Sequence, residues 1–332
     1  MRFLRSLILF CLFIALLLVG FGYWWATTPV LLRGTPPVEF RILPGSGLRS
    51  IAGQVADAGV DVQPQLLVIL GKLMRAETSI KAGSYAVNAG LTPLQLLKKL
   101  TSGDVSQAEI KLVEGWTFRQ WRDRLDAHAD LRHDTRGLSE AEILAKLNVE
   151  APRLEGLLFP DTYLFDKQSS DLELLARAQR AAKRRLEVEW NQRANGLPYK
   201  TPYQALIMAS IVEKETGRDA DRPMVAAVFV NRLRLGMLLQ TDPTVIYGMG
   251  ARFDGNLRKR DLQTDTPYNT YTRAGLPPSP IAMPGVASLR AALNPAQSDV
   301  LYFVARGDGS SQFSRSLEEH NRAVNRYQRG IK

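Results

Sequence analysis

The feature that most constrains this chain is an uncharged, apolar stretch near its N-terminus. It covers residues 7–26, and the basic residues Arg2 and Arg5 precede it. Twenty residues are about the length that a helix needs to cross the hydrocarbon core of a bilayer. The stretch ends with Trp24 and Trp25, which are typical of a membrane interface. We therefore expect a transmembrane helix over residues 7–26.

A cleaved signal peptide is the alternative for the same segment. Such a peptide needs small residues at its cleavage site, and the bulky Trp24 and Trp25 stand there instead. The positive charges of Arg2 and Arg5 favour a cytoplasmic segment over residues 1–6. We therefore expect a single-pass membrane protein whose N-terminus lies in the cytoplasm and whose remaining chain lies outside it.

Composition narrows the choice of partner. The 332 residues include 43 Lys and Arg against 33 Asp and Glu, which gives a net charge of +10. This excess favours anionic lipid or an acidic polymer. The basic residues never form a run of five, so we expect no nucleic acid partner. The one cysteine, Cys11, lies inside the apolar stretch. Disulfides and thiol catalysis are therefore not expected in the exported part.

The next part of the chain has a repeated local pattern. Alternating apolar residues are followed by Gly, Ser or Thr and then by a helical period, at 39–59, 82–103 and 108–127. A proline-containing segment, 27–37, precedes the first repeat and is expected to be a linker. With an apolar helical segment at 64–75, the pattern predicts a small α+β module over residues 38–104.

The second half of the chain is predicted to be mixed, and the fold class is therefore α+β. Residues 131–195 are expected to be mainly helical, with a break at 155–165 and a long basic helix over 171–194. Further helices follow residue 201. The Gly-, Pro- and Thr-rich stretch 240–285 is too long for an ordinary loop, which indicates a functional role.

The sequence ASIVEKETG (209–217) contains the best catalytic candidate. It ends a predicted helix that begins with a Thr201–Gln204 capping box. Glu213 and Glu215 are about 200° apart on a helix, so they face different ways. Glu215 ends the larger apolar stripe, where desolvation and the helix dipole would raise its pKa. A protonated carboxyl of this kind suits a general acid. A surface glutamate paired with Lys or Arg remains the alternative.

Neighbouring segments indicate the kind of ligand. Residues 239–250 and 264–285 are rich in Thr, Tyr, Asn, Gln and Pro, which suit a sugar better than a phosphate. Glycine-rich phosphate-binding motifs and a nucleophilic serine elbow do not occur. We expect His128 and His133 to lie on the surface, and His320 to have a capping or core role, although it could border a cleft. We expect no metal and no cofactor.

Four motifs resemble a known family, namely ASIVEKETG, VFVNRLRLGMLLQTDPTVIYGMG, YNTYTRAGLPPSPIAMPG and LYFVARGDGSSQFSRSLEEHN. They are similar to the YceG-like family of endolytic murein transglycosylases. The resemblance implies a LysM-like module over 38–104. It also implies a catalytic domain over 105–332, of mixed α/β structure with a lytic-transglycosylase-like helical active-site region.

The resemblance further implies an activity and a site. The expected reaction is cleavage of the MurNAc–GlcNAc bond in nascent peptidoglycan, by a catalytic domain in the periplasm close to the inner (cytoplasmic) membrane. The cleavage leaves 1,6-anhydro ends and could terminate strand elongation. Glu215 would be catalytic, since Glu215-Thr216 resembles the Glu-Ser/Thr pair of other lytic transglycosylases. The expected substrate-binding residues are Asn231, Gln240, Thr241, Asp242, Tyr268, Asn269 and Tyr271. The expected partners are glycan strands, the inner membrane and peptidoglycan synthases (penicillin-binding proteins).

Two other functions remain open at this stage. A muramidase-type hydrolase needs a second carboxylate beside the bond, for which the candidates are Asp242, Asp254, Asp261 and Asp265. A non-catalytic peptidoglycan-binding scaffold for synthases needs no acid at all. A transglycosylase needs only one carboxyl, because the 6-hydroxyl of the sugar is the nucleophile.

Overall fold

The computed structural model describes residues 2–330, and the chain divides into two compact units. The first unit contains residues 1–109 together with the returning segment 164–169. The second contains residues 110–163 and 170–332. Helices and short two-stranded sheets occur in both units, which confirms a mixed α+β fold.

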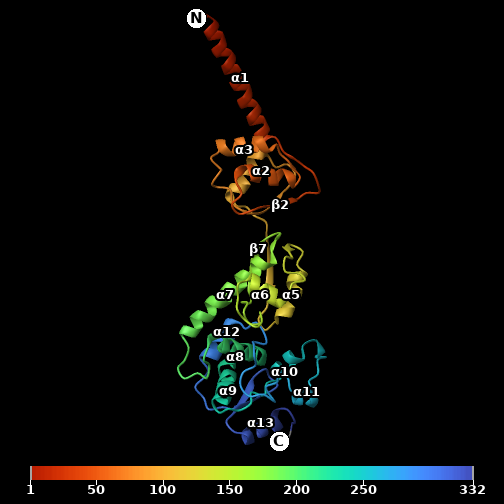
Figure 1. Cartoon of the computed structure of the whole chain (residues 1–332), viewed down its shortest axis with the longest axis vertical. Helices are drawn as coiled ribbons and strands as arrows, with labels where there is room; N and C mark the ends of the chain where they lie inside the picture. Colours follow the sequence, from red (N-terminus) through yellow and green to blue (C-terminus); the bar gives the residue numbers. More distant parts are fainter. Residues whose placement is uncertain (1, 331–332) are drawn as a thin grey trace. The chain divides into compact units, whose positions relative to one another are not determined.

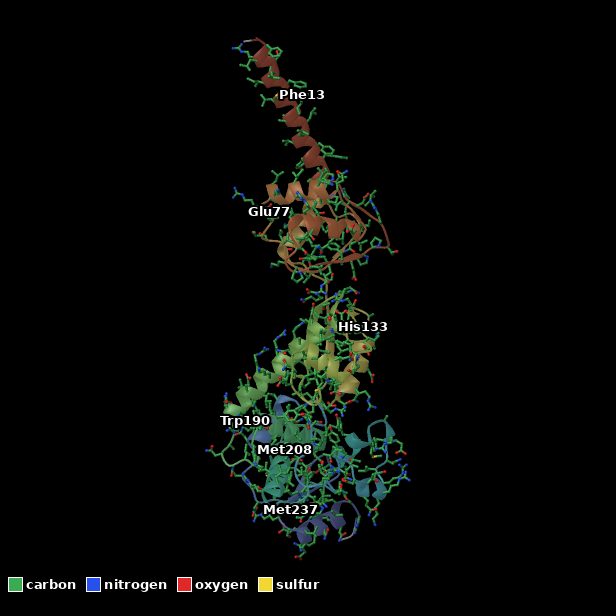
Figure 2. All side chains as sticks on the ribbon, in the orientation of Figure 1. Phe13, Glu77, His133, Trp190, Met208 and Met237 are labelled. Carbon is green, nitrogen blue, oxygen red and sulfur yellow. The ribbon has the colours of Figure 1, made fainter. Side chains whose placement is uncertain are left out.

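The N-terminal helix α1 (Arg2–Thr27) is the apolar segment that the sequence predicted. Within it, Phe3–Thr27 is long and apolar enough to cross a membrane. Its side chains, such as Phe13, point away from the helix with no protein packed against them (Figure 2). Only the last turn contacts the rest of the first unit, where Ala26 is buried and Trp25 packs against the core.

The first unit confirms the first two of the three predicted strand–turn–helix repeats. Its elements are β1 (Leu31–Leu32), β2 (Val38–Ile42), α2 (Leu48–Asp57), β3 (Val60–Asp61), α3 (Pro64–Leu73), β4 (Gly83–Val87) and α4 (Pro93–Ser102) (Figure 1). β2 and β4 pair antiparallel, with Val38 opposite Val87 and Ile42 opposite Gly83. The inward residues of this pair pack with α2, α3 and α4 to form one apolar core.

The segment 27–37, which the sequence predicts to be a linker, contains a short strand. Leu31 and Leu32 form β1, which pairs antiparallel with β3. The backbone N–H of Val30 donates to the carbonyl of Leu91 over 2.8 Å, and that of Arg33 donates to Gly59 over 2.7 Å. These backbone bonds attach the chain to the first unit within a few residues of the end of α1.

The following region has more strand than the sequence predicted. Its elements are β5 (Gln107–Leu112), α5 (Phe118–Asp126), β6 (Leu131–Arg132), α6 (Glu140–Lys146), β7 (Asp161–Asp166), β8 (Ser169–Ser170) and α7 (Asp171–Asn191). β5 pairs with β7, and β6 pairs with β8. The predicted break at 155–165 is therefore partly a strand, whose partner β5 lies about 50 residues earlier in the chain.

The remaining elements form the helical part of the second unit. They are α8 (Pro202–Glu215), α9 (Arg222–Arg234), α10 (Asp242–Met249), η1 (Gly250–Arg252), α11 (Lys259–Gln263), α12 (Val286–Leu293), β9 (Tyr302–Ala305), β10 (Ser311–Ser314) and α13 (Leu317–Tyr327). α8 packs against α7, α9, α10 and α12. Its residues from Ala205 to Val212 are all buried, so this helix is the centre of the core.

The ends of α8 differ in detail from the sequence prediction. The Thr201 side chain accepts from the backbone N–H of Gln204, and Pro202 occupies the first turn. The Gln204 side chain, however, accepts from Lys200 over 2.6 Å, so only half of the capping box forms. The helix stops at Glu215 because Thr216 is extended. Glu215 is thus the last residue of a buried helix.

Candidate active site

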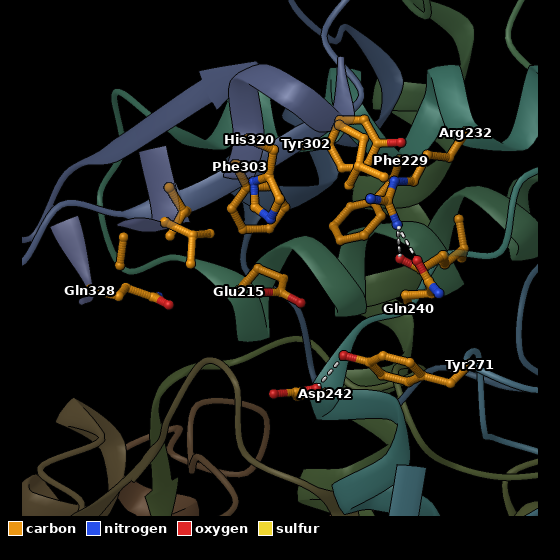
Figure 3. A pocket seen from close by; sticks show the side chains of 15 residues that line it. Glu215, Phe229, Arg232, Gln240, Asp242, Tyr271, Tyr302, Phe303, His320 and Gln328 are labelled. Carbon is orange, nitrogen blue, oxygen red and sulfur yellow. Dashed lines mark hydrogen bonds between the residues drawn. The ribbon is translucent and has the colours of Figure 1, made fainter. Parts of the chain in front are cut away.

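A cavity of about 600 Å³ in the second unit opens at the C-terminal end of α8. Glu215 lines it together with residues of α9, α10, β9 and α13. In Figure 3, the Glu215 carboxyl lies between Asp242 on one side and the aromatic group of Phe303 and His320 on the other. Five elements thus converge on one carboxyl group.

Burial of the Glu215 carboxyl raises its pKa to about 7. The negative charge of Asp242 raises the pKa further, whereas the Thr241 hydroxyl and the Arg232 charge lower it. Thr241 donates its hydroxyl to Oε1 of Glu215. A carboxyl with a pKa near 7 is divided between its acid and its base form at neutral pH, so it can give and take a proton.

The backbone before α10 holds Thr241 against Glu215. Gln240 has a φ of +52°, in the left-handed region that residues other than glycine rarely adopt. The N–H of Gln240 donates to the Thr270 carbonyl, and the N–H of Thr241 donates to the Thr270 hydroxyl, both over 3.1 Å. Strained backbone fixed by hydrogen bonds is common at functional sites. The arrangement places a hydroxyl donor on the acid.

Asp242 and Tyr271 form the opposite wall of the cavity. The Tyr271 hydroxyl donates to the Asp242 carboxylate over 2.5 Å (Figure 3). Burial and the charge of Asp242 raise the pKa of Tyr271, so it remains a hydrogen-bond donor at neutral pH. Asp242 itself is exposed to solvent. It therefore acts on Glu215 as a nearby negative charge.

Arg232 connects α9 to two other walls of the cavity. Its guanidinium donates to the backbone carbonyls of Leu301 over 2.7 Å and of Leu239 over 2.9 Å. The Tyr302 ring lies 5.0 Å from the guanidinium carbon and also stacks on His320. Burial lowers the pKa of both Arg232 and His320. The arginine holds β9 and the segment before α10 in place.

Three of the expected substrate-binding residues lie elsewhere. Asn269 is fully buried: its amide donates to the Leu262 and Thr264 carbonyls, and its oxygen accepts from the Tyr271 N–H. Asn231 donates to the Ser298 and Val300 carbonyls. Neither side chain lines the cavity. We expect Asn269 to position Tyr271 rather than to bind sugar.

Tyr268 also lies outside the residues that line the cavity. Its hydroxyl is 2.7 Å from the Ser279 hydroxyl, and its ring packs edge-on against Tyr247 at 4.8 Å. Gln240, Asp242 and Tyr271 do line the cavity. Of the seven expected binding residues, these three and Thr241, which bonds to Glu215, are the ones that surround the acid.

Glu213 faces away from the cavity, as its angular separation from Glu215 predicted. Its Oε2 accepts the backbone N–H of Gly285 over 2.9 Å, just before α12 begins. The charge of Glu213 also helps to raise the pKa of the neighbouring Glu114, after burial. Glu213 therefore joins α8 to the segment before α12.

The other three candidates for a second carboxylate interact with groups outside the cavity lining. Asp254 pairs with Arg258 at 2.6 Å, and Asp265 pairs with Arg273 at 2.8 Å. Asp261 accepts the backbone N–H of Arg258 over 2.9 Å. Among the four candidates, only Asp242 lines the cavity.

His133 is less exposed than the sequence predicted, and its Nδ1 is buried. It forms a group with Asp126 and Asp171, whose ligand atoms lie within 4.8 Å of one another. Arg122 pairs with Asp126 at 3.5 Å, and Thr135 donates both its N–H and its hydroxyl to Asp171. Since both carboxylates have protein donors, we interpret this group as a polar junction between α5 and α7.

Sequence reasoning missed most of the wall that α9, β9 and α13 supply. The missed residues are Phe229, Arg232, Tyr302, Phe303, Leu317, Val324 and Gln328. His320 lines the cavity too, so the cleft position that the sequence left open for it is the observed one. One signal was available, because residues 317, 320, 324 and 328 share one face of a helix. Nothing in the local sequence, however, indicates that this face meets Glu215.

Comparisons with known proteins identify the family of the chain. The model of a family described as YceG-like matches residues 40–326. The chain belongs to the YceG-like family. This confirms the resemblance that the four motifs indicated, and the matched range includes Glu215 and the cavity-lining residues up to Val324.

Similar proteins are known from other bacteria. A Bacillus subtilis (strain 168) protein named endolytic murein transglycosylase is 34% identical over 90% of this chain and 87% of its own length. A Streptococcus pneumoniae (strain ATCC BAA-255 / R6) protein of the same name is 29% identical, over 95% of this chain and 64% of its own length. The crystal structure of a putative YceG-like protein from Listeria monocytogenes has a TM-score of 0.54 and 31% identity, and covers 87% of this chain and 99% of that one.

Proposed function

We propose that this chain is an endolytic lytic transglycosylase that cuts the MurNAc–GlcNAc bond of peptidoglycan strands. The observation that carries the proposal is the Glu215 carboxyl, with a pKa of about 7, at the head of a cavity lined by hydrogen-bonding and aromatic groups. The name of the Bacillus relative, endolytic murein transglycosylase, supports the same activity.

The proposed reaction uses Glu215 twice. Its protonated carboxyl first gives the proton to the glycosidic oxygen, and the bond from that oxygen to C1 of MurNAc breaks. The resulting carboxylate then takes the proton of the MurNAc 6-hydroxyl, whose oxygen bonds to C1. The products are a new GlcNAc hydroxyl and a 1,6-anhydro-MurNAc end, and Glu215 is protonated again. Water is not consumed.

Thr241 and Asp242 have opposite roles in this scheme. Thr241 stabilises the carboxylate form that exists between the two proton transfers, because its hydroxyl donates to Oε1. The charge of Asp242 favours the protonated form that starts the reaction. Their balance keeps the pKa near neutrality, where one group can serve as acid and then as base.

A hydrolase of muramidase type is less well supported. It would need a carboxylate to act as nucleophile or to activate water, and only Asp242 of the four candidates lines the cavity. Asp242 accepts the Tyr271 hydroxyl. In our proposal this aspartate tunes Glu215, and the sugar provides its own nucleophile.

We also propose that the protein works at the periplasmic face of the inner membrane. The apolar helix Phe3–Thr27 and the positive charges of Arg2 and Arg5 support a single-pass anchor with a cytoplasmic N-terminus. An enzyme held there would meet new strands beside the synthases that make them, and its cuts could end strand elongation. We further propose that the first unit, residues 38–104 in particular, is a LysM-like module.

Mass spectrometry of purified glycan strands treated with the full-length protein tests the proposed activity. We expect internal cleavage with 1,6-anhydro-MurNAc at the new ends. New reducing ends would instead identify a hydrolase. Binding of the strands without cleavage, together with full function of a Glu215→Gln protein in cells, would identify a scaffold.

A further inference from the structure

The helix α3 in the first unit has an apolar face that no other part of the described chain covers. The side chains of Ile69, Leu73 and Met74 are 53%, 78% and 47% exposed. The opposite side of the helix, at Leu67 and Gly71, is buried. Large apolar groups grouped in this way on a soluble surface usually mark a contact site.

Basic residues accompany this apolar face. Lys72 and Arg75 are exposed, and neither forms an ion pair within residues 2–330. A helix with apolar residues on one side and basic residues beside them is typical of segments that lie at a membrane surface. We call Ile69, Lys72, Leu73, Met74 and Arg75 the α3 face.

The connection between α1 and the first unit leaves little freedom. The N–H of Thr28 donates to the Trp24 carbonyl over 2.9 Å, which prolongs the helical end, and Val30 then bonds to Leu91 over 2.8 Å. β1 follows at once and pairs with β3. Trp25 packs on the apolar core of the unit. The unit therefore begins where the helix ends, with no free spacer between them.

The length of α1 then fixes how far the first unit lies from the bilayer centre. Counted from Leu7, the twenty residues to Ala26 span about 30 Å at 1.5 Å per residue, which equals the hydrocarbon thickness. Trp24 and Trp25 accordingly lie at the interface, where tryptophan is favoured. A protein core that packs on Trp25 must start at that same level.

Within the first unit, α3 lies at the end from which α1 emerges (Figure 1). At the other end, the β2–β4 ladder finishes at Ile42 and Gly83, and the adjacent Ser84 donates its hydroxyl to the Lys167 carbonyl of the returning segment 164–169. The exposed apolar side chains of α3 are thus at the level of the lipid headgroups.

We propose that the α3 face is a second membrane contact, which inserts Ile69, Leu73 and Met74 into the headgroup region beside the anchor. Lys72 and Arg75 would lie among the lipid phosphates, where each basic residue near an anionic surface adds to the attraction. The contact would stop the first unit from tilting about the single helix. This proposal rests on the proposed membrane anchoring and adds a surface to it.

Fluorescence quenching in proteoliposomes tests the α3 face directly. The full-length protein with Cys11→Ser would carry one new cysteine, at Leu73→Cys, labelled with an environment-sensitive dye. The liposomes would contain phosphatidylethanolamine and phosphatidylglycerol, with a fraction of lipid spin-labelled near the headgroup. We expect the label at position 73 to be quenched severalfold more than a label at the control position.

The matched control is Leu43→Cys, which is exposed by 52% in the same unit and directly follows Ile42 at the far end of the ladder. Tyr23→Cys, on α1, reports whether the anchor is in the bilayer. Equal, weak quenching at 73 and 43 with strong quenching at 23 would overturn the α3 proposal alone. Weak quenching at 23 would overturn the anchor and the α3 proposal together.

A contact between two copies of the chain is the competing explanation for an apolar surface. It predicts that Leu73→Cys forms disulfide-linked dimers and that its dye is shielded equally in detergent and in liposomes. Our proposal predicts shielding from water only in liposomes. Efficient dimer formation at position 73, without lipid quenching, would therefore refute it.

Discussion

Removal of the Thr241 hydroxyl should move the pH dependence of cleavage in a direction that the structure defines. Thr241 is buried, and valine has nearly the same shape, so Thr241→Val removes little beyond the hydrogen bond to Glu215. This hydroxyl stabilises the carboxylate form and lowers the pKa. The variant should therefore have a Glu215 pKa above the wild-type value of about 7.

The size of the shift follows from the strength of the hydrogen bond. A bond to a charged group contributes about 1.5–3 kcal/mol, and one pKa unit corresponds to about 1.4 kcal/mol. We expect the pKa to rise by about one unit, to about 8 if it starts from about 7. Since the first step needs the protonated acid, kcat/KM of the wild type should fall at pH values above the pKa of Glu215. In the variant, this alkaline limb of the pH profile should lie about one pH unit higher.

The assay is the rate of formation of anhydro ends from purified strands, measured as kcat/KM between pH 5 and 9. Thr266→Val is the matched control, because the Thr266 hydroxyl is also buried but has no hydrogen-bond partner within the described residues. The control should keep the alkaline limb of kcat/KM at the wild-type pH. If the alkaline limb of Thr241→Val stays at that pH or moves to lower pH, Thr241 does not tune the pKa of Glu215 as we propose.

Three further changes test other parts of the account. Asp242→Asn removes a charge that raises the Glu215 pKa, so the alkaline limb of kcat/KM should move to lower pH; an upward shift would contradict this. Glu155 is buried, which raises its pKa from 4.5 to about 7. Between these pH values the folded state holds a proton that the unfolded state releases, so the free energy of unfolding should fall as pH rises from about 4.5 to 7. Glu155→Gln should remove this loss, which is at most about 3 kcal/mol when chemical unfolding at pH 8 is compared with pH 5. If the substitution changed the free energy of unfolding equally at both pH values, the predicted pH dependence would be refuted. Asn269→Ala should disorder Tyr271 and raise KM, because Asn269 accepts the Tyr271 N–H; an unchanged KM would show that Tyr271 is positioned by other contacts.

Local patterns in the sequence predicted the elements that depend on local physics. The apolar length of α1, the strand–turn–helix repeats and the place of Glu215 at the end of α8 follow from residue periods and cap residues. The opposite directions of Glu213 and Glu215 follow from helix geometry alone, and the bond of Glu213 to Gly285 confirms them.

Long-range pairing could not be predicted in the same way. β7 forms because β5 supplies its partner, and β1 forms because β3 lies beside it, so the prolines around β1 did not indicate that part of the segment 27–37 is a strand. Arg232 and His320 reach Glu215 from helices that are far apart in the sequence. Asn269 looked like a ligand-binding amide, yet its polar atoms are satisfied by its own loop.

The central claim is that Glu215 alone is the acid and the base. The most direct measurement is the rate of anhydro-end formation by Glu215→Gln compared with Glu213→Gln, with the fold of each checked by circular dichroism. We predict a loss of about 10²-fold or more for Glu215→Gln, the usual contribution of general acid–base catalysis. Glu213→Gln should keep most of the activity, because glutamine can still accept the Gly285 N–H. A folded Glu215→Gln protein with wild-type activity, or a loss confined to Glu213→Gln, would contradict the account.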